Sequence, residues 1–200
     1  MSPIEIGTVK QVHAYGVIAL SYNRLEDFLI YHIAAYFPPP EAREAERHED
    51  EPAMVCVRML NNRQRLDFLK TLVFYNEKDN LISQRVIDAI DVFEICAENR
   101  NILAHGRRDS YDFDIDIFTI RKLASGSAYR EVFFDIPLLE LRNVANDMVM
   151  ALNYFFDLNA FLIKHRLGLD DFEIDGRSDP YRPTLPEKPQ IPRKLTPRPP

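Results

Sequence analysis

The sequence predicts a mainly α-helical protein, a bundle of about four long helices with a small β-hairpin inserted before the last helix. Two patterns lead to this prediction. Apolar residues recur at steps of three and four over long stretches, which is the period of a helix with one buried face. After residue 106 apolar and acidic residues alternate instead, as in a half-buried strand. With 200 residues, 46% hydrophobic and 28% charged, the chain has the size and composition of one ordinary globular domain.

The N-terminal quarter of the chain predicts one long helix between two irregular segments. Residues 1–8 are expected to be a lead-in, because Ser2-Pro3 disfavours an early helix. Helical spacing of apolar residues then predicts a helix over Val9–Phe37, which Pro38-Pro39-Pro40 ends. Residues 41–52 are almost all charged and are expected to form an exposed loop.

A second helix is predicted over Met54–Tyr75, with a break at Asn61-Asn62 as an open alternative. One side of it is basic and is expected either to face solvent or to form a wall of an RNA groove (Arg58, Arg63, Arg65 and Lys70). A turn and cap at Lys78-Asp79-Asn80 predict that a third helix begins near Leu81. Gly106 is expected to end it, because glycine tolerates the left-handed conformation that follows many helices.

The segment after this helix predicts two strands. Tyr111–Ile117 alternates apolar residues with aspartates, Ala124–Ser127 has the composition of a turn, and Tyr129–Ile136 is again β-prone. This order predicts a β-hairpin insertion over about residues 111–136. The aspartates do not fit a calcium loop, because Ile117 stands where that loop requires glycine and the intervening residues are bulky. No metal site is therefore predicted.

The last predicted helix has the clearest apolar stripe, from Leu138 to Leu162, and is expected to end near Gly168. The predicted helical domain therefore spans residues 9–168. Residues 169–200 form an acidic loop and a proline-rich basic tail, and the tail is predicted to be extended or disordered because it holds eight of the fourteen prolines.

The net charge of −6 is unevenly distributed. Residues 177–200 contain six basic and two acidic side chains, a charge of +4, so residues 1–176 carry −10. An acidic body does not attract nucleic acid in general, so if RNA binds, it must do so at a local basic patch. The best candidate patch consists of Arg100, His105, Arg107 and Arg108.

The chain is expected to be soluble and cytoplasmic. It shows no secretory leader and no apolar run long enough to span a bilayer, so no membrane association is predicted. Cys56 and Cys96 lie far apart in apolar helical contexts and are expected to be free buried thiols, with a disulfide or a ligand pair as the alternative. No phosphate-binding glycine loop or CxxC pair occurs, and no cofactor is predicted.

The candidate catalytic residues, Arg100, Asn101 and His105, lie near the end of the third predicted helix. The apolar stripe of that helix comprises Val86, Ile90, Phe93 and Ala97. Its continuation falls on Arg100 or Asn101, and burying an unpaired guanidinium is costly. Arg100 is therefore expected either to pair internally or to face a partner or ligand. Asn101 and His105 are four residues apart and share a helix face, which the long Arg100 side chain can reach.

The segment Arg100-Asn101-x-x-x-His105 resembles the R-x(4–6)-H motif of HEPN domains, which are small helical bundles. The resemblance implies a homodimer with the two motif helices facing each other, and a metal-independent endoribonuclease. Arg100 would bind or orient the scissile phosphate, His105 would act on the attacking 2′-hydroxyl or the leaving oxygen, and Asn101 would position them. Arg107 and Arg108 would add substrate binding. A toxin–antitoxin or defence setting is implied, with an antitoxin or a nucleotidyltransferase-like partner.

Two alternatives stay open at this point. The first is a HEPN-like dimer that binds a protein or a nucleotide without catalysis. The second is a structural helical protein in which Arg100 makes an internal salt bridge with Glu26, Asp27 or Glu94.

Overall fold

A computed structural model describes most of the chain, and the chain divides into two compact units. The described residues are 9–37, 52–112, 117–123, 130–167, 173–174, 177–178 and 184–199. Unit 1 combines residues 1–23, 92–151 and 190–200, and unit 2 combines residues 24–91 and 152–189. Each unit therefore draws on segments that lie far apart in the sequence, and each is described below by itself.

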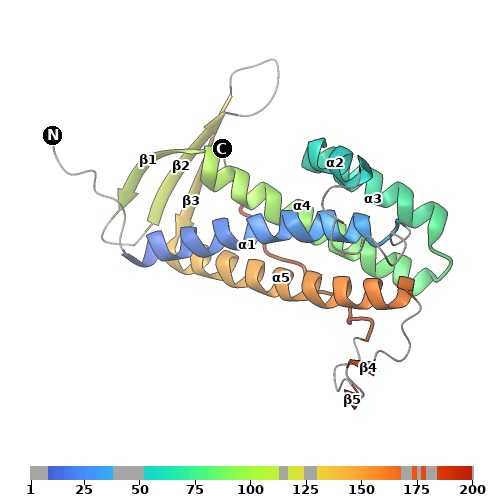
Figure 1. Cartoon of the computed structure of the whole chain (residues 1–200). Coiled ribbons are helices and arrows are strands. Elements are labelled where there is room, and N and C mark those ends of the chain that lie inside the picture. Colours follow the sequence, from blue (N-terminus) through green and yellow to red (C-terminus); the bar gives the residue numbers. More distant parts are fainter. Residues whose placement is uncertain are drawn as a thin grey trace. The chain divides into compact units, whose positions relative to one another are not determined.

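The described residues are mainly helical, as predicted (Figure 1). The helices are α1 (Val9–Ala34), α2 (Pro52–Met59), α3 (Asn62–Asn76), α4 (Asn80–His105) and α5 (Leu138–Leu167). None of the described helices has both the length and the apolar character that crossing a membrane requires. The predicted lead-in at residues 1–8 and the charged loop up to residue 51 lie outside the described residues.

The break predicted as an alternative at Asn61-Asn62 is present, and it separates α2 from α3. The Asn61 side chain accepts a hydrogen bond from the Gln64 backbone N–H at 3.0 Å, and the Gln64 side chain accepts one from the Asn61 N–H at 3.0 Å. This reciprocal capping satisfies backbone donors that the first turn of α3 leaves free. Arg65 donates to the Val57 carbonyl at 3.1 Å and the Arg58 carbonyl at 2.7 Å. Arg65 therefore closes the end of α2 instead of forming a free basic surface.

The β insertion is larger than the predicted hairpin. It is a three-stranded antiparallel sheet in the order β1 (Arg107–Asp112), β2 (Ile117–Leu123) and β3 (Glu131–Pro137). The prediction of one strand over 111–117 was wrong, because this run is divided between β1 and β2. Periodicity alone does not show where a chain reverses direction within an alternating run. The predicted turn at 124–127 lies outside the described residues.

In unit 1 one face of the sheet carries a buried apolar cluster. Phe118 and Ile120 of β2 stand opposite Ile136 and Phe134 of β3, and all four side chains are buried. Side chains alternate between the two faces of a strand, so Thr119 and Arg121 lie on the other face. Tyr15 of α1 contacts Phe118, with ring centroids 6.0 Å apart. The sheet is therefore anchored to the helical part of unit 1 by aromatic packing.

Two sequence predictions about the remaining residues need correction. The C-terminal tail was predicted to be disordered or extended, but residues 184–199 are described, with Leu195 only 1% exposed. Disorder is therefore wrong for this segment, since apolar packing and hydrogen bonds hold it in place. Cys96 is buried as predicted, whereas Cys56 is exposed, and both thiols are free. The short strand β4 (Glu173–Ile174) lies in the predicted acidic loop, and its partner β5 (Arg177–Ser178) lies at the start of the predicted tail.

The core of unit 2 contains a histidine. His32 of α1 is fully buried, stacks on Phe155 of α5 with ring centroids 5.1 Å apart, and lies with Nε2 3.2 Å from the Phe155 carbonyl oxygen. A carbonyl only accepts hydrogen bonds, so Nε2 carries a proton and donates it. Burial lowers the pKa of His32 to about 4, and the hydrogen bond to Phe155 opposes this effect. His32 is therefore packed and neutral in the folded chain.

The buried His32 predicts a loss of stability in acid. The unfolded chain binds a proton at His32 below about pH 6.5, whereas the folded chain does not until about pH 4. Above the pKa of His32 in the unfolded chain, the contribution of His32 to stability is fully present. As the pH falls from about 6.5 to about 4, the free energy of unfolding decreases by about 1.4 kcal/mol per pH unit. The measurement is the free energy of unfolding in urea between pH 7.5 and 4.5, compared with His32→Gln, which keeps a donor. Equal pH slopes for the two proteins would contradict the prediction.

Candidate active site

The candidate catalytic residues lie in the last two turns of α4, within unit 1, and Gly106 ends this helix. The Gly106 N–H donates to the Ile102 carbonyl at 3.0 Å. The predicted left-handed conformation is absent, since its φ lies outside that region. A Cβ atom at Gly106 would instead lie 2.1 Å from Cγ2 of Ile120 in β2 and 2.5 Å from the Ile102 carbonyl oxygen. Glycine is required here because β2 approaches the helix end closely.

The structure brings Arg100, Asn101 and His105 together. Nη1 of Arg100 donates to Oδ1 of Asn101 at 3.2 Å and lies 3.3 Å from Nε2 of His105. A guanidinium has only donors, so Nε2 of His105 accepts this hydrogen bond with its lone pair. A neutral imidazole in this pair carries its proton on Nδ1, a tautomer assigned from the contact itself. The predicted cluster of an arginine, an amide and a histidine therefore exists in the folded chain.

Tyr22 of α1 is a member of this site that the sequence did not reveal. Cζ of Arg100 lies 5.3 Å from the centroid of the Tyr22 ring. Tyr22 is 2% exposed. The Tyr22 ring packs on Phe93 with centroids 5.6 Å apart. A guanidinium over an aromatic face gains a cation–π attraction. This contact explains how Arg100 is half-buried, because in the described part of the chain it makes no ion pair with a carboxylate.

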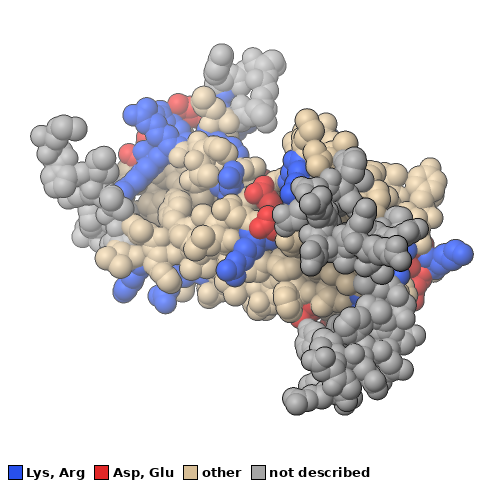
Figure 2. Space-filling model, viewed as in Figure 1, with Lys and Arg blue, Asp and Glu red and all other residues tan. Residues whose placement is uncertain are grey.

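Arg107 and Arg108, predicted to bind substrate, are consecutive residues of β1 and both are exposed. Consecutive strand residues point to opposite faces, so the two do not form a single patch. Arg107 stands opposite Arg121, and Arg108 stands opposite Ile120. The charge of Arg108 acts on Tyr15, where it lowers the pKa, although burial dominates and raises that pKa to about 12. Lys and Arg side chains gather over the sheet (Figure 2).

Neighbouring polar residues serve structural contacts. The exposed Glu98 carboxylate pairs with Nζ of Lys194 at 2.7 Å. Asn99 is 1% exposed and binds the backbone of the C-terminal segment. The predicted stripe of α4 is therefore correct through Phe93 but not beyond it, since Asn99, Ile102 and Leu103 are buried while Ala104 is exposed.

No other described histidine has the surroundings of His105. His32 is packed in unit 2, and His165, at the end of α5, stacks on Phe161 with ring centroids 5.5 Å apart. Among the described residues, no group of three or more His, Cys, Asp and Glu side chains is close enough to hold a metal ion. The site itself contains a guanidinium, an amide and an imidazole, groups that are suited to binding a phosphate and to proton transfer.

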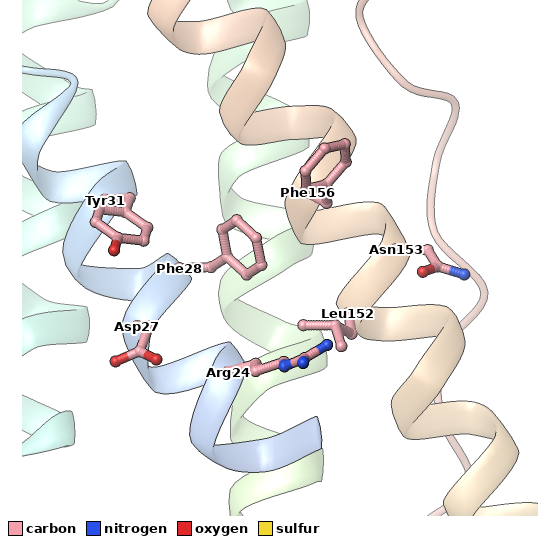
Figure 3. Close-up of a pocket in the computed structure, with 7 residues that line it drawn as sticks. All are labelled: Arg24, Asp27, Phe28, Tyr31, Leu152, Asn153 and Phe156. Carbon is pink, nitrogen blue, oxygen red and sulfur yellow. The ribbon is translucent and has the colours of Figure 1, made fainter. Parts of the chain in front are cut away.

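A shallow pocket in unit 2 is the second candidate site (Figure 3). It is lined by Arg24, Asp27, Phe28 and Tyr31 of α1 and by Leu152, Asn153 and Phe156 of α5. Phe28 contacts both Tyr31 and Phe156 edge to face, with centroids 6.0 Å apart in each pair. Tyr31 is 46% and Phe156 is 54% exposed. The pocket offers aromatic surface but no hydrogen-bonded set of catalytic groups.

No family model, curated protein or solved structure matches the chain. The function therefore has to be argued from the geometry of the site.

Proposed function

We propose that the chain is a metal-independent endoribonuclease of the HEPN type, acting through Arg100, Asn101 and His105. The observation that supports this proposal is the contact of one Arg100 nitrogen with both Asn101 and His105. These three side chains hold one another at the surface end of a helix, beside a sheet edge rich in arginine. The resemblance to the HEPN motif rests on the same three residues.

The reaction requires few groups because RNA supplies its own nucleophile. The 2′-oxygen attacks the adjacent phosphorus and the bond from phosphorus to the 5′-oxygen breaks, which leaves a 2′,3′-cyclic phosphate and a 5′-hydroxyl. Arg100 is suited to bind two phosphate oxygens and to stabilise their growing charge, and the Tyr22 ring holds it in place. Nε2 of His105 carries the lone pair that accepts the 2′-hydroxyl proton once the phosphate has drawn Arg100 away from it.

The leaving 5′-oxygen needs a proton, which a second imidazole can supply. We infer that the active form is a homodimer in which the two motif helices face each other. In each reaction one His105 then acts as the base and the His105 of the other copy acts as the acid. This arrangement balances the protons without a metal ion.

The test is cleavage of a mixed RNA pool by the purified chain in excess EDTA. We expect products with 2′,3′-cyclic phosphate and 5′-hydroxyl ends, and no cleavage of a matched oligonucleotide with 2′-deoxyribose at the cleaved position. The deoxy control is decisive because it removes only the nucleophile. Cleavage of that control, 5′-phosphate ends, or an intact RNA pool would each contradict the proposal.

A second candidate function, docking of a protein partner, is favoured by the pocket in unit 2. Its exposed aromatic side chains, Tyr31 and Phe156, resemble the anchors that carry binding energy in protein interfaces. A chain that only docks a partner leaves RNA intact, so the same assay separates the two functions.

A further inference from the structure

The C-terminal segment shows a period of three in both sequence and burial. Prolines occur at positions 183, 186, 189 and 192, and Leu195 follows at the same interval. Pro192 and Leu195 are buried, whereas Arg193, Lys194 and Thr196 between and after them are exposed. A polyproline II chain repeats every three residues, so it presents such a set of residues on one side. Unit 1 includes residues 190–200, and residues 190–198 of this part are called the strap.

Asn99 of α4 is the first anchor of the strap. Its Nδ2 donates to the Arg193 carbonyl at 2.8 Å, and its Oδ1 accepts from the Leu195 N–H at 2.9 Å. The residue is 1% exposed. The donor and the acceptor of the buried Asn99 amide therefore both form hydrogen bonds with the backbone of the strap.

The strap has further anchors on α5 and β3. The Asp147 carboxylate, on a residue 8% exposed, accepts from the Arg193 N–H at 3.0 Å and from its Nε at 2.7 Å. The Arg198 N–H donates to the Phe133 carbonyl at 2.7 Å, and its guanidinium pairs with Asp135. Without the strap, the Asn99 amide and the Asp147 carboxylate would lose these partners, and a polar group left unpaired in a buried position is costly. The two buried groups therefore favour the state in which the strap is bound.

The anchor at Asn99 lies directly before the candidate catalytic residues. Asn99 precedes Arg100 in α4, and His105 is the last residue of that helix. The final turn of a helix lacks partners for its carbonyls and opens easily unless other contacts hold it. The strap contacts α4 at Glu98 and Asn99, which fixes the part of the helix from which Arg100 projects.

We propose that residues 190–198 are a detachable positioning element for Arg100 and His105. The inference rests on the proposed function, since it assigns a role in that site. With the strap docked on Asn99, the guanidinium and the imidazole keep the arrangement that cleavage needs. When the strap leaves, the end of α4 loosens and cleavage falls, although neither side chain has changed.

The experiment compares Leu195→Asp with Thr196→Asp in the full chain. Both add one negative charge to the strap, but the first places it at a buried position and the second at an exposed one. Docking is read from alkylation of Cys96 in a Cys56→Ser background. Cys96 is fully buried, and burial together with the charge of Asp147, the carboxylate that binds Arg193 of the strap, raises its pKa to about 12. Its thiol is therefore unreactive in the folded chain, and its alkylation reports local opening beside Asp147.

We expect Leu195→Asp to raise the alkylation rate of Cys96 at least about tenfold, because local opening governs access to buried groups. RNA cleavage falls by about tenfold or more, since small displacements of catalytic groups are costly. Thr196→Asp stays close to the parent protein in both measurements. A synthetic peptide of residues 190–200, added to the Leu195→Asp protein, restores both. If Leu195→Asp fails to fold, Arg193→Glu is the second variant designed to release the strap, because it places a negative charge next to the Asp147 carboxylate. These two substitutions are called the release variants.

The NMR signals of the His105 imidazole, assigned with His105→Ala, separate this inference from the proposed function. If the parent chain leaves RNA intact, the proposed function fails, and the strap is still tested by whether release shifts these signals and the peptide restores them. If a release variant has a reactive Cys96 but keeps the cleavage rate and the His105 signals of the parent, the positioning role is overturned. Protection of Cys96 in both release variants would show that the strap is not detachable.

Discussion

Arg100→Lys is expected to reduce RNA cleavage by roughly a hundredfold to a thousandfold, almost as much as Arg100→Ala, because a preorganised donor to the phosphate is lost. Lysine keeps the positive charge but not the planar fork of donors. The fork matters here because Arg100 contacts Asn101 and His105 through one nitrogen while its plane lies over Tyr22. The measurement is the single-turnover cleavage rate in EDTA.

The control for this variant is Arg63→Lys, the same change at an exposed position of α3. His105→Ala should lower the rate by roughly a hundredfold to ten-thousandfold, the usual contribution of a general acid or base. His165→Ala, which removes an exposed histidine from the end of another helix, should leave the rate unchanged. Full activity of Arg100→Lys would show that Arg100 acts as a simple charge, and full activity of His105→Ala would remove the histidine from the mechanism.

Gly106→Ala is expected to destabilise the chain by about 3 kcal/mol, the upper part of the range for overpacking a filled position. The new Cβ would lie 2.1 Å from Ile120 and 2.5 Å from the Ile102 carbonyl oxygen. The oxygen belongs to the helix backbone, so either α4 or β2 has to move. The melting temperature should fall by roughly 6 to 12 °C for a domain of this size.

Gly16→Ala is the matched control for this prediction. A Cβ at Gly16, in the interior of α1, would meet nothing within 4 Å. Alanine has a higher helix propensity than glycine, so this variant should be more stable than the parent by up to about 1 kcal/mol. A stability of Gly106→Ala equal to that of the parent would show that the contact between the end of α4 and Ile120 yields easily.

Much of the fold could be predicted from the sequence because apolar periodicity identifies long helices well. The prolines after Phe37 predicted the end of α1, and the two asparagines at 61–62 predicted the break between α2 and α3. Both predictions rest on local effects, the missing N–H of proline and the capping ability of asparagine. The sheet was harder to predict. Arg107 and Arg108 give no strand signal by themselves, and they join β1 only because β2 lies beside them. A strand of that kind depends on pairing and not on its own residues.

The site shows the same division between local and distant information. Arg100, Asn101 and His105 were identifiable because their contacts are between residues one to five apart in α4. Tyr22 and the strap were not, since both come from distant parts of the sequence. For the strap, the spacing of three residues between prolines was a signal of an extended polyproline chain. That interval shows that one side of an extended chain is regular but does not show which surface it covers.

The strap also has a consequence for protein synthesis. Unit 1 includes residues 1–23, 92–151 and 190–200, and translation adds them in that order. Tyr22 and α4 are made early, but the partners of Asn99 and Asp147 come only with residues 193–195. A nascent chain that has not reached these residues cannot hold the end of α4 as the finished protein does. If the chain is the proposed nuclease and the strap positions its site, the chain stays inactive toward ribosomal RNA until nearly the whole of unit 1 has been translated.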